Sequence, residues 1–421
     1  MTELTQAAGN FLNRERAARL LAAAGLDALV IAEPEGFRYA TGASQGVAGF
    51  FRRAGAGFAV IPADLLLPAM AVITDAAEAG FRAHSPITEL RVHPAWIEAA
   101  DLRLAGAGDA SIAARVRGAW RERAPGFARP ATFDLGSAVS CLRDLLQLHG
   151  LRHARLGFDL DFIAASDMGV ITAALEGARI GNGSPVLDRL RMVKAPAEIE
   201  RLRLGAELGE AGIIALREGA RAGQGVTELR DLFRAGVDRE AARRGVAHPE
   251  ATHEYIAIGP NPWQPGVVEP GAIIKVDVVC TIEGYMSDTS RNFVFGPASP
   301  AQRELHLALE AAFITGSALI RPGVKLRDVH AVTTASLHAA GFAGYSRGHF
   351  GHSLGHSIFS EQAPFIAADA TLAFEADMMM AFEIPLYLEG FGAFNLEDQL
   401  LLTEAGHVSI NRLPRQLVEI G

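Results

Sequence analysis

The pattern of apolar and polar positions divides the chain into two parts with different predicted architectures. The first part alternates helical periods with short apolar runs of strand length, beginning with a helical pattern near residues 14–24. The runs that predict strands are 27-DALVIA-32, 57-GFAVI-61, 70-MAVIT-74 and 155-RLGFD-159. Strands that alternate with helices in this way indicate an α/β domain.

The change of pattern falls near residue 186. Around 181-GNGSPV-186 a cluster of glycine, proline and serine gives way to a long helix. Its apolar stripe consists of Ile199, Leu202, Ala206, Ile213 and Leu216. We therefore predict an amino-terminal α/β domain over residues 1–186 and a second domain over 187–421. Another helix is predicted to begin at residue 226, with Thr227 capping its first turn.

The second domain separates its strands from its helices. Two helical stretches, near 301–319 and 326–339, lie between apolar runs of strand character. These runs are 273-IIKVDVVC-280, 379-MMAFEIPLYL-388 and 396-LEDQLLLT-403. This separation is typical of an α+β domain in which helices cover one face of an antiparallel sheet.

Composition excludes several classes of protein. With 49% hydrophobic and 21% charged residues, the 421-residue chain reads as a soluble globular protein. A net charge of −9 and the lack of any basic run argue against nucleic-acid or anionic-membrane partners. Neither a targeting segment at the start nor an apolar run of about 18 residues is present, so we expect a cytoplasmic protein. The two cysteines, Cys141 and Cys280, form no C-x-x-C pair, so any metal must bind to oxygen and imidazole.

Four acidic residues interrupt strongly apolar runs of the second domain. Asp277 lies within a predicted strand, Asp288 follows eleven residues later, and a hairpin turning near 283-EG-284 would bring both to one side of a sheet. Glu383 and Glu397 interrupt or open two further apolar strands. Each acid alone is explained equally well as a strand-end residue facing water. Four that converge would repel one another, and divalent cations relieve that repulsion. Oxygen ligands with one imidazole suit manganese, iron, cobalt or zinc.

The order of these residues resembles a known family. Asp277, Asp288, 351-GHSLG-355, Glu383 in FEIPLY and Glu397 in EDQLLLTEAG resemble the five ordered ligand motifs of the pita-bread metallopeptidases. That family includes aminopeptidase P, prolidase, methionine aminopeptidase and the metal-free creatinase. The segments 192-MVKAPAEIERLR-203 and 26-LDALVIAEPEGFRYATG-42 are similar to its prolidase branch, so the resemblance covers nearly the whole chain.

The resemblance implies a fold and a chemistry. It implies a creatinase/prolidase-type α/β domain followed by an α+β pita-bread domain that hydrolyses a C–N bond in a small amide or short peptide, as Xaa-Pro dipeptidases and aminopeptidases do. Asp288 and Glu397 would bridge two divalent ions, manganese being the first candidate, while Asp277 completes one site and His352 with Glu383 the other. A bridging water would be the nucleophile and Glu383 its proton acceptor. A homodimer is expected from the family alone.

Two segments depart from the peptidase pattern. The peptidases have a histidine in the stretch that corresponds to 259-GPNPWQPGVVEPG-271, whereas this chain has none between 254 and 305 and places Trp263 and Gln264 there. The segment 351-GHSLGHSIFSEQAPF-365 is about two residues longer than expected. His356 is therefore a candidate catalytic and substrate-binding residue, and His349 a candidate substrate contact or a simple turn residue. Trp263 is either a packing residue or a substrate platform.

Other functions remain open on the sequence. The 261-NPW-263 arrangement is similar to that of a side branch of the family, the dimethylsulfoniopropionate lyases. However, 277-DVV-279 lacks the D-x-D motif of that branch. An amide hydrolase of a compatible solute or creatine-like compound, and a catalytically silent binding protein, are further alternatives. In 49-GFFRR-53, Phe50, Arg52 and Arg53 either form a solvated loop or, as the resemblance implies, contact substrate in a partner subunit. Arg291, in an S-D-x-x-R pattern, is expected to be structural.

Overall fold

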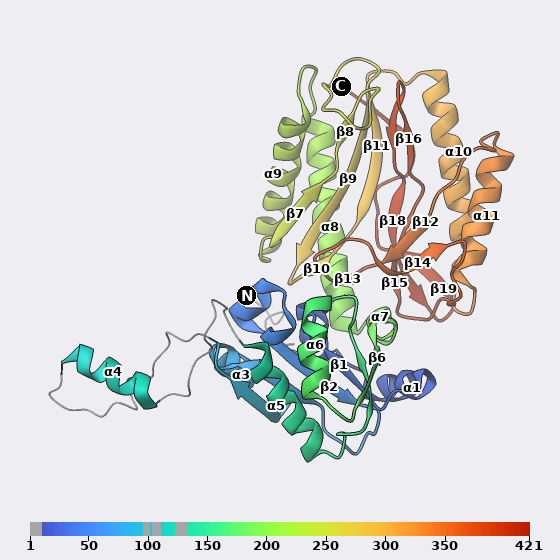
Figure 1. Cartoon of the computed structure of the whole chain (residues 1–421). Coiled ribbons are helices and arrows are strands. Elements are labelled where there is room, and N and C mark those ends of the chain that lie inside the picture. Colours follow the sequence, from blue (N-terminus) through green and yellow to red (C-terminus); the bar gives the residue numbers. More distant parts are fainter. Residues whose placement is uncertain (1–10, 96–101, 103–110, 123–133) are drawn as a thin grey trace. The chain divides into compact units, whose positions relative to one another are not determined.

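The computed structural model describes residues 11–95, 102, 111–122 and 134–421, which form two compact units (Figure 1). The units meet in the sequence between Leu190 and Arg191, four residues after the expected boundary. Helix α7 (Ser184–Arg191) accounts for the difference, because its Val186, Leu187 and Leu190 are buried in the core of the amino-terminal unit.

The amino-terminal unit is an α/β layer structure. Its six-stranded sheet has the order β4-β3-β2-β1-β5-β6 and mixes parallel with antiparallel neighbours. Alternate residues of β1 enter different cores: Leu29 and Ile31 on one face, Ala28 and Val30 on the other. Both faces of the sheet are therefore covered, which confirms the predicted class. The elements are α1 (Arg14–Ala24), β1 (Ala28–Ile31), α2 (Pro34–Thr41), β2 (Gly57–Pro62), β3 (Met70–Thr74), α3 (Glu78–His84), β4 (Glu89–His93), α4 (Ile112–Glu122), α5 (Leu135–Leu148), β5 (Arg155–Phe158), α6 (Ala165–Ala174) and β6 (Arg179–Asn182).

The carboxy-terminal unit is built on one long sheet of central order β13-β10-β9-β11-β18-β15-β12-β14, with β7, β8, β19 and β20 pairing beside it. Its strands are β7 (Ala251–Glu254), β8 (Ala257–Ile258), β9 (Ile273–Ile282), β10 (Tyr285–Met286), β11 (Thr289–Phe295), β12 (His349–Ser353), β13 (Gly355–His356), β14 (Gln362–Ala367), β15 (Met379–Glu383), β18 (Glu397–Thr403), β19 (Gly406–Ser409) and β20 (Val418–Ile420). A separate ribbon pairs β16 (Leu386–Leu388) with β17 (Gly392–Phe394).

Two helix pairs cover this sheet. Helices α8 (Pro196–Gly219) and α9 (Val226–Arg244) pack on the half that contains β9, and α10 (Pro300–Ser317) and α11 (Leu326–Ala339) pack on the half that contains β12, β15 and β18 (Figure 1). The rings of Phe313 in α10 and Phe382 in β15 lie 4.9 Å apart between their centroids. The expected α+β arrangement is therefore confirmed.

Two local predictions were wrong. Thr227 does not cap α9, because the helix begins at Val226 and the carboxylate of Glu228 accepts a hydrogen bond from the Gly225 N–H at 3.0 Å. The single strand predicted over 379–388 divides after Glu383, where Pro385 has no N–H to donate to a ladder.

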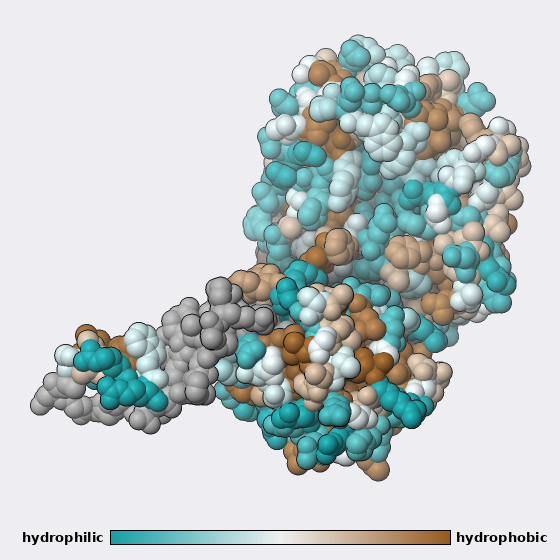
Figure 2. All heavy atoms as spheres, viewed as in Figure 1, coloured by the Kyte–Doolittle hydropathy of each residue, from teal (hydrophilic) through white to brown (hydrophobic). Residues whose placement is uncertain are grey.

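Hydrophilic and hydrophobic side chains are interspersed on the face of each unit shown in Figure 2. Among the described helices, none combines the length and the apolar character that crossing a membrane requires.

Candidate active site

A row of opposed residues crosses four strands of the long sheet. Asp277 on β9 lies opposite Ser290 on β11, Ser290 lies opposite Glu397 on β18, and Glu397 lies opposite Glu383 on β15. Like charges directly opposite one another destabilise a sheet unless another group offsets them. Three of the four predicted acids therefore lie in one row, where a cation would offset their mutual repulsion.

The fourth acid reaches this row through a tight turn. Glu283 and Gly284 both have positive φ angles, 50° and 82°, and form a two-residue turn between β9 and β10, as expected. The backbone N–H of Asp288 then donates to the side-chain oxygen of Gln399 at 2.8 Å, which holds Asp288 against β18. One carboxylate oxygen of Asp288, Oδ1, is buried and has no hydrogen-bond partner among the described residues.

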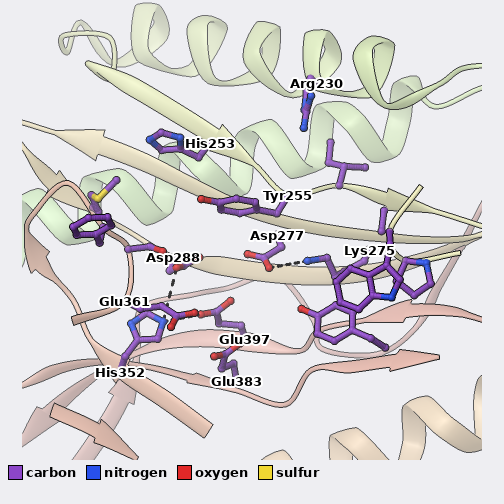
Figure 3. Close-up of a pocket in the computed structure, with 18 of the residues that line it drawn as sticks. Arg230, His253, Tyr255, Lys275, Asp277, Asp288, His352, Glu361, Glu383 and Glu397 are labelled. Atoms are coloured by element: carbon purple, nitrogen blue, oxygen red, sulfur yellow. Dashed lines mark hydrogen bonds and ion pairs between the residues drawn. The ribbon is translucent and has the colours of Figure 1, made fainter. Parts of the chain in front are cut away.

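His352 completes a buried three-residue group with Asp288 and Glu397 (Figure 3). Its Nε2 lies 4.0 Å from Asp288 Oδ2 and 3.9 Å from Glu397 Oε1. Its Nδ1 lies 3.2 Å from the Ser353 carbonyl oxygen. A proton on Nδ1 leaves the Nε2 lone pair directed at the two carboxylates, which is the orientation of a metal-binding imidazole.

Electrostatics of this group favour a bound cation. Burial, followed by the charges of neighbouring carboxylates, raises the pKa of Asp288 and of Glu397 well above the ordinary range. Burial also lowers the pKa of His352, which favours its neutral form. A divalent ion would stabilise both carboxylates in their charged form and use the neutral imidazole, so the donors present fit a transition metal.

Glu383 belongs to a second group, with His349 and Glu361. Its Oε1 accepts from Arg347 Nη2 at 2.5 Å and lies 3.8 Å from His349 Nδ1. The side-chain amide of Asn395 donates both to Glu383 at 3.3 Å and to Glu397 at 3.2 Å. The hydrogen bond with His349 lowers the pKa of Glu361. Glu383 is therefore held from two sides.

Lys275 is a site residue that sequence reasoning missed. Its Nζ donates to Asp277 Oδ2 at 2.9 Å, and Figure 3 shows the two side chains pointing toward each other from β9. Burial alone would lower the pKa of Lys275, but the charge of Asp277 with other nearby groups raises it above the ordinary value, so this side chain is a cation. The available signal was the one used for Asp277: a charged residue inside an apolar strand, two positions away and on the same face.

The acids lie in a cavity of about 880 Å³. Aromatic side chains form part of its wall, and the rings of Trp263 and Tyr387 lie 5.3 Å apart. Arg230, His253 and Tyr255 line the same cavity (Figure 3). Trp263, 72% exposed, is therefore placed where a substrate would meet it. His253 stands one position before the stretch that lacks a histidine, and sequence reasoning missed it.

Other predicted site residues lie elsewhere. His356 on β13 packs edge-on against Tyr285, with ring centroids 5.3 Å apart, and does not line the cavity. The hypothesis that it contacts substrate has no support in this geometry. In the amino-terminal unit, Arg52 pairs with Glu35 at 2.8 Å and Arg53 with Asp167 at 2.6 Å. The Arg53 side chain nevertheless remains 53% exposed, so the solvated-loop and substrate-contact interpretations of this segment both stay predictions.

Arg291 has a structural position, as expected. Its guanidinium donates to Asp398 Oδ1 at 2.7 Å and to the Glu397 carbonyl at 2.7 Å, and both Arg291 and Asp398 are buried. These bonds fix the start of β18, which carries Glu397.

Known proteins share both units. Residues 200–404 match the model of metallopeptidase family M24, and residues 13–193 match the creatinase/prolidase N-terminal domain. The chain therefore belongs to metallopeptidase family M24. Relatives named dipeptidase and Xaa-Pro dipeptidase support a metal-dependent hydrolase, and this M24 chain carries the buried donors that such an enzyme needs.

Individual relatives agree with this membership. The M24 chain is 24% identical over 298 residues to the uncharacterized peptidase YqhT of Bacillus subtilis, covering 67% of this chain and 79% of the relative. It is 27% identical over 245 residues to an Xaa-Pro dipeptidase of Lactobacillus helveticus, covering 56% and 64%. The structure of an Xaa-Pro dipeptidase from Bacillus anthracis shares the fold, with a TM-score of 0.74, 19% identity, and coverage of 97% of this chain and all of that one.

Proposed function

We propose that this M24 chain hydrolyses the C–N bond of a small amide or short peptide, with an Xaa-Pro dipeptide as the first candidate. The observation that carries the proposal is the buried group of Asp288, His352 and Glu397 beside Glu383 in one cavity. A cavity of about 880 Å³ is of the size that small-molecule sites have. The name of the Lactobacillus helveticus relative supports the choice of substrate.

Asp288, His352 and Glu397 would hold the metal. The family resemblance also implies Glu383 and Asp277 as ligands, but here Glu383 is paired with Arg347 and Asp277 with Lys275. Oxygen donors with one imidazole suit manganese, iron, cobalt or zinc. When bound, such an ion lowers the pKa of a water molecule and polarises the attacked carbonyl. Two ions bridged by Asp288 and Glu397, as the family resemblance implies, stay a prediction.

The protein's own groups have separate tasks in this proposal. Glu383 takes the proton of the attacking water and returns it to the leaving amine, and Arg347 and Asn395 keep its carboxylate in place. Arg230 and His253, which line the same cavity, would bind the carboxylate end of a peptide and offset charge on the carbonyl oxygen. The missing histidine near Trp263 would thereby be replaced from β7.

The direct test is a substrate panel with protein purified without chelator and loaded with Mn²⁺. Xaa-Pro dipeptides, other small amides and dimethylsulfoniopropionate are incubated in turn, and free amine or dimethyl sulfide is measured. We expect free proline from the wild type and none from Asp288→Asn, which also loses bound metal. The matched control is Asp369→Asn, because Asp369 is an exposed carboxylate of the same unit. A protein that retains no metal and a fully folded Asp288→Asn variant that behaves like the wild type would refute the proposal.

One observation favours the lyase alternative. Tyr255, Trp263, Phe359, Phe365 and Tyr387 all line the cavity, and aromatic faces attract a sulfonium or quaternary ammonium group. Release of dimethyl sulfide, with no amine from any amide, would select this second function over the first. The binding-protein alternative predicts neither product and no need for the buried acids.

A further inference from the structure

Lys275 places a positive charge inside the candidate active site. The side chain lies on the cavity face of β9, is only 5% exposed, and donates to Asp277 Oδ2 at 2.9 Å. Its ammonium also lies 5.7 Å from the centre of the Tyr387 ring. Figure 3 shows it directed at Asp277. The ammonium is therefore a built part of the site.

Asp277 is consequently engaged by a cation of the chain itself. Of the two metal-capable groups within the described part of the chain, neither contains Asp277. A transition metal bound to this carboxylate would have to approach its oxygen to about 2.0–2.2 Å. The ammonium already lies against the same carboxylate, and a divalent ion there would meet the repulsion of a fixed cation at short range. Lysine and a second metal are therefore competitors for one carboxylate.

The charges of the row agree with this competition. Asp277, Asp288, Glu383 and Glu397 carry four negative charges when ionised. Lys275 offsets one at Asp277, and Arg347 offsets one at Glu383, each through a direct ion pair. Glu361 is paired with His349 at 3.3 Å. The two charges that remain, on Asp288 and Glu397, match one divalent ion, and these are the two acids that share a buried group with His352.

We propose that this M24 chain binds a single divalent ion, at Asp288, His352 and Glu397, and that the Lys275 ammonium takes the place of a second ion at Asp277. This inference rests on the proposed function, because it assigns the number of ions in the same site. Lys275 then acts as a positioning residue: it holds the Asp277 carboxylate and supplies one fixed positive charge to the cavity.

The test is metal stoichiometry with the full chain. Wild-type protein is loaded with excess Mn²⁺, freed of unbound metal by gel filtration, and analysed for manganese per chain. We expect about one ion, and an electron paramagnetic resonance spectrum of isolated Mn²⁺ without the exchange coupling of a close pair. Two tightly bound ions in the wild type would overturn the inference and leave the hydrolase proposal intact. No bound ion would overturn both.

Variants of Lys275 test the cause. Lys275→Met removes the charge but keeps a side chain of similar length. We expect the manganese content of this variant to rise to about two exchange-coupled ions per chain. Lys275→Arg keeps the charge and should remain at about one. In Lys275→Met/Asp277→Asn the second ion should be lost again, because its carboxylate is gone. One ion in Lys275→Met, with wild-type circular dichroism, would overturn the role of Lys275. If Lys275→Met does not fold, the wild-type stoichiometry and the Lys275→Arg variant still decide.

Discussion

Glu383 and Glu397 face each other on neighbouring strands, and the side-chain amide of Asn395 donates to both. In the proposed mechanism this bridge lies between a metal ligand and a proton acceptor: Glu397 shares the buried group with Asp288 and His352, whereas Glu383 lies with Arg347 and His349. At the scale of single residues, these different partners favour Glu383 as the proton acceptor of the proposed mechanism.

Glu383→Gln tests that division. The amide keeps the shape of the side chain but cannot accept a proton, so we expect turnover to fall by a factor on the order of 10²–10⁴. Metal content at saturating Mn²⁺ should remain, because Asp288, His352 and Glu397 are untouched. Turnover is measured with the substrate that the panel selects, and metal by elemental analysis. Wild-type turnover in this variant would remove Glu383 from the proton-transfer role.

His306 is a buried titratable group away from the acids. It lies on α10 against Phe394, its Nε2 has no hydrogen-bond partner in the described residues, and burial with the nearby charge of Arg291 lowers its pKa to about 4. The usual pKa of histidine is near 6.5, so between about pH 6.5 and pH 4 the unfolded chain binds a proton at this residue that the folded chain does not. Stability is therefore lost as pH falls through this window, by at most about 1.4 kcal/mol per pH unit.

His306→Gln should reduce that loss. Urea unfolding of the full chain at pH 7, 6 and 5, with chelator present throughout, compares the slope with that of the wild type. Since glutamine gains no proton, the variant should lose less stability on acidification. Identical slopes in the two proteins would contradict the shifted pKa.

The sequence revealed the four acids because their charges conflict with their apolar surroundings, and His352 because 351-GHSLG-355 resembles a ligand motif of the family. Lys275 carries the same conflict, but a lysine is not a metal ligand and was passed over. Glu361 gave no signal, since its loop reaches His349 only through the folding of β12 against β14. His356 was misplaced because proximity in sequence to His352 does not decide which edge of the sheet a strand joins.

At the scale of elements, β12 depends on one glycine. Gly351 has a φ of 146°, and a Cβ there would lie 2.1 Å from the Ala381 carbonyl oxygen of β15. Gly351→Ala should therefore destabilise the fold by roughly 2–5 kcal/mol and displace the neighbouring His352. Thermal unfolding and metal content measure the two effects. Gly348→Ala is the matched control, because nothing lies within 4 Å of its Cβ. Equal unfolding midpoints for the two variants would refute the packing argument.

Element positions were predictable where hydrophobic period and turn residues agree. The apolar runs located β1, β2, β3, β5, β9 and β18, and the helical period located α1, α8, α10 and α11. The order of strands in the sheet was not predictable, because β18 pairs with β11 and β15 through contacts between residues far apart in the sequence. The break after Glu383 depends on Pro385 and on the separate ribbon of β16 and β17.

At the scale of the whole molecule, the amino-terminal unit presents Phe50, which is 86% exposed. Arg52 and Arg53 are already paired inside that unit, so Phe50 is the better candidate for the substrate contact that the family resemblance implies. Phe50→Ser should raise KM by roughly five-fold, about 1 kcal/mol for partial burial of a ring, with kcat retained. Leu66→Ser, at another exposed apolar position of this unit, should leave KM unchanged. Equal KM values in both variants would exclude the contact.

Homodimerisation and cytoplasmic location stay predictions, and sedimentation velocity tests the first.

The position of β18 in the sheet has a consequence for synthesis on the ribosome. This strand lies between β11 and β15, yet it is made after both of them. A nascent chain that ends before residue 397 has two half-sheets, each with an unpaired edge next to where β18 will insert. Such edges template intermolecular pairing, so the chain is exposed to aggregation until the segment that carries β18 is made. A premature stop in that segment would therefore yield an insoluble product instead of a shortened enzyme.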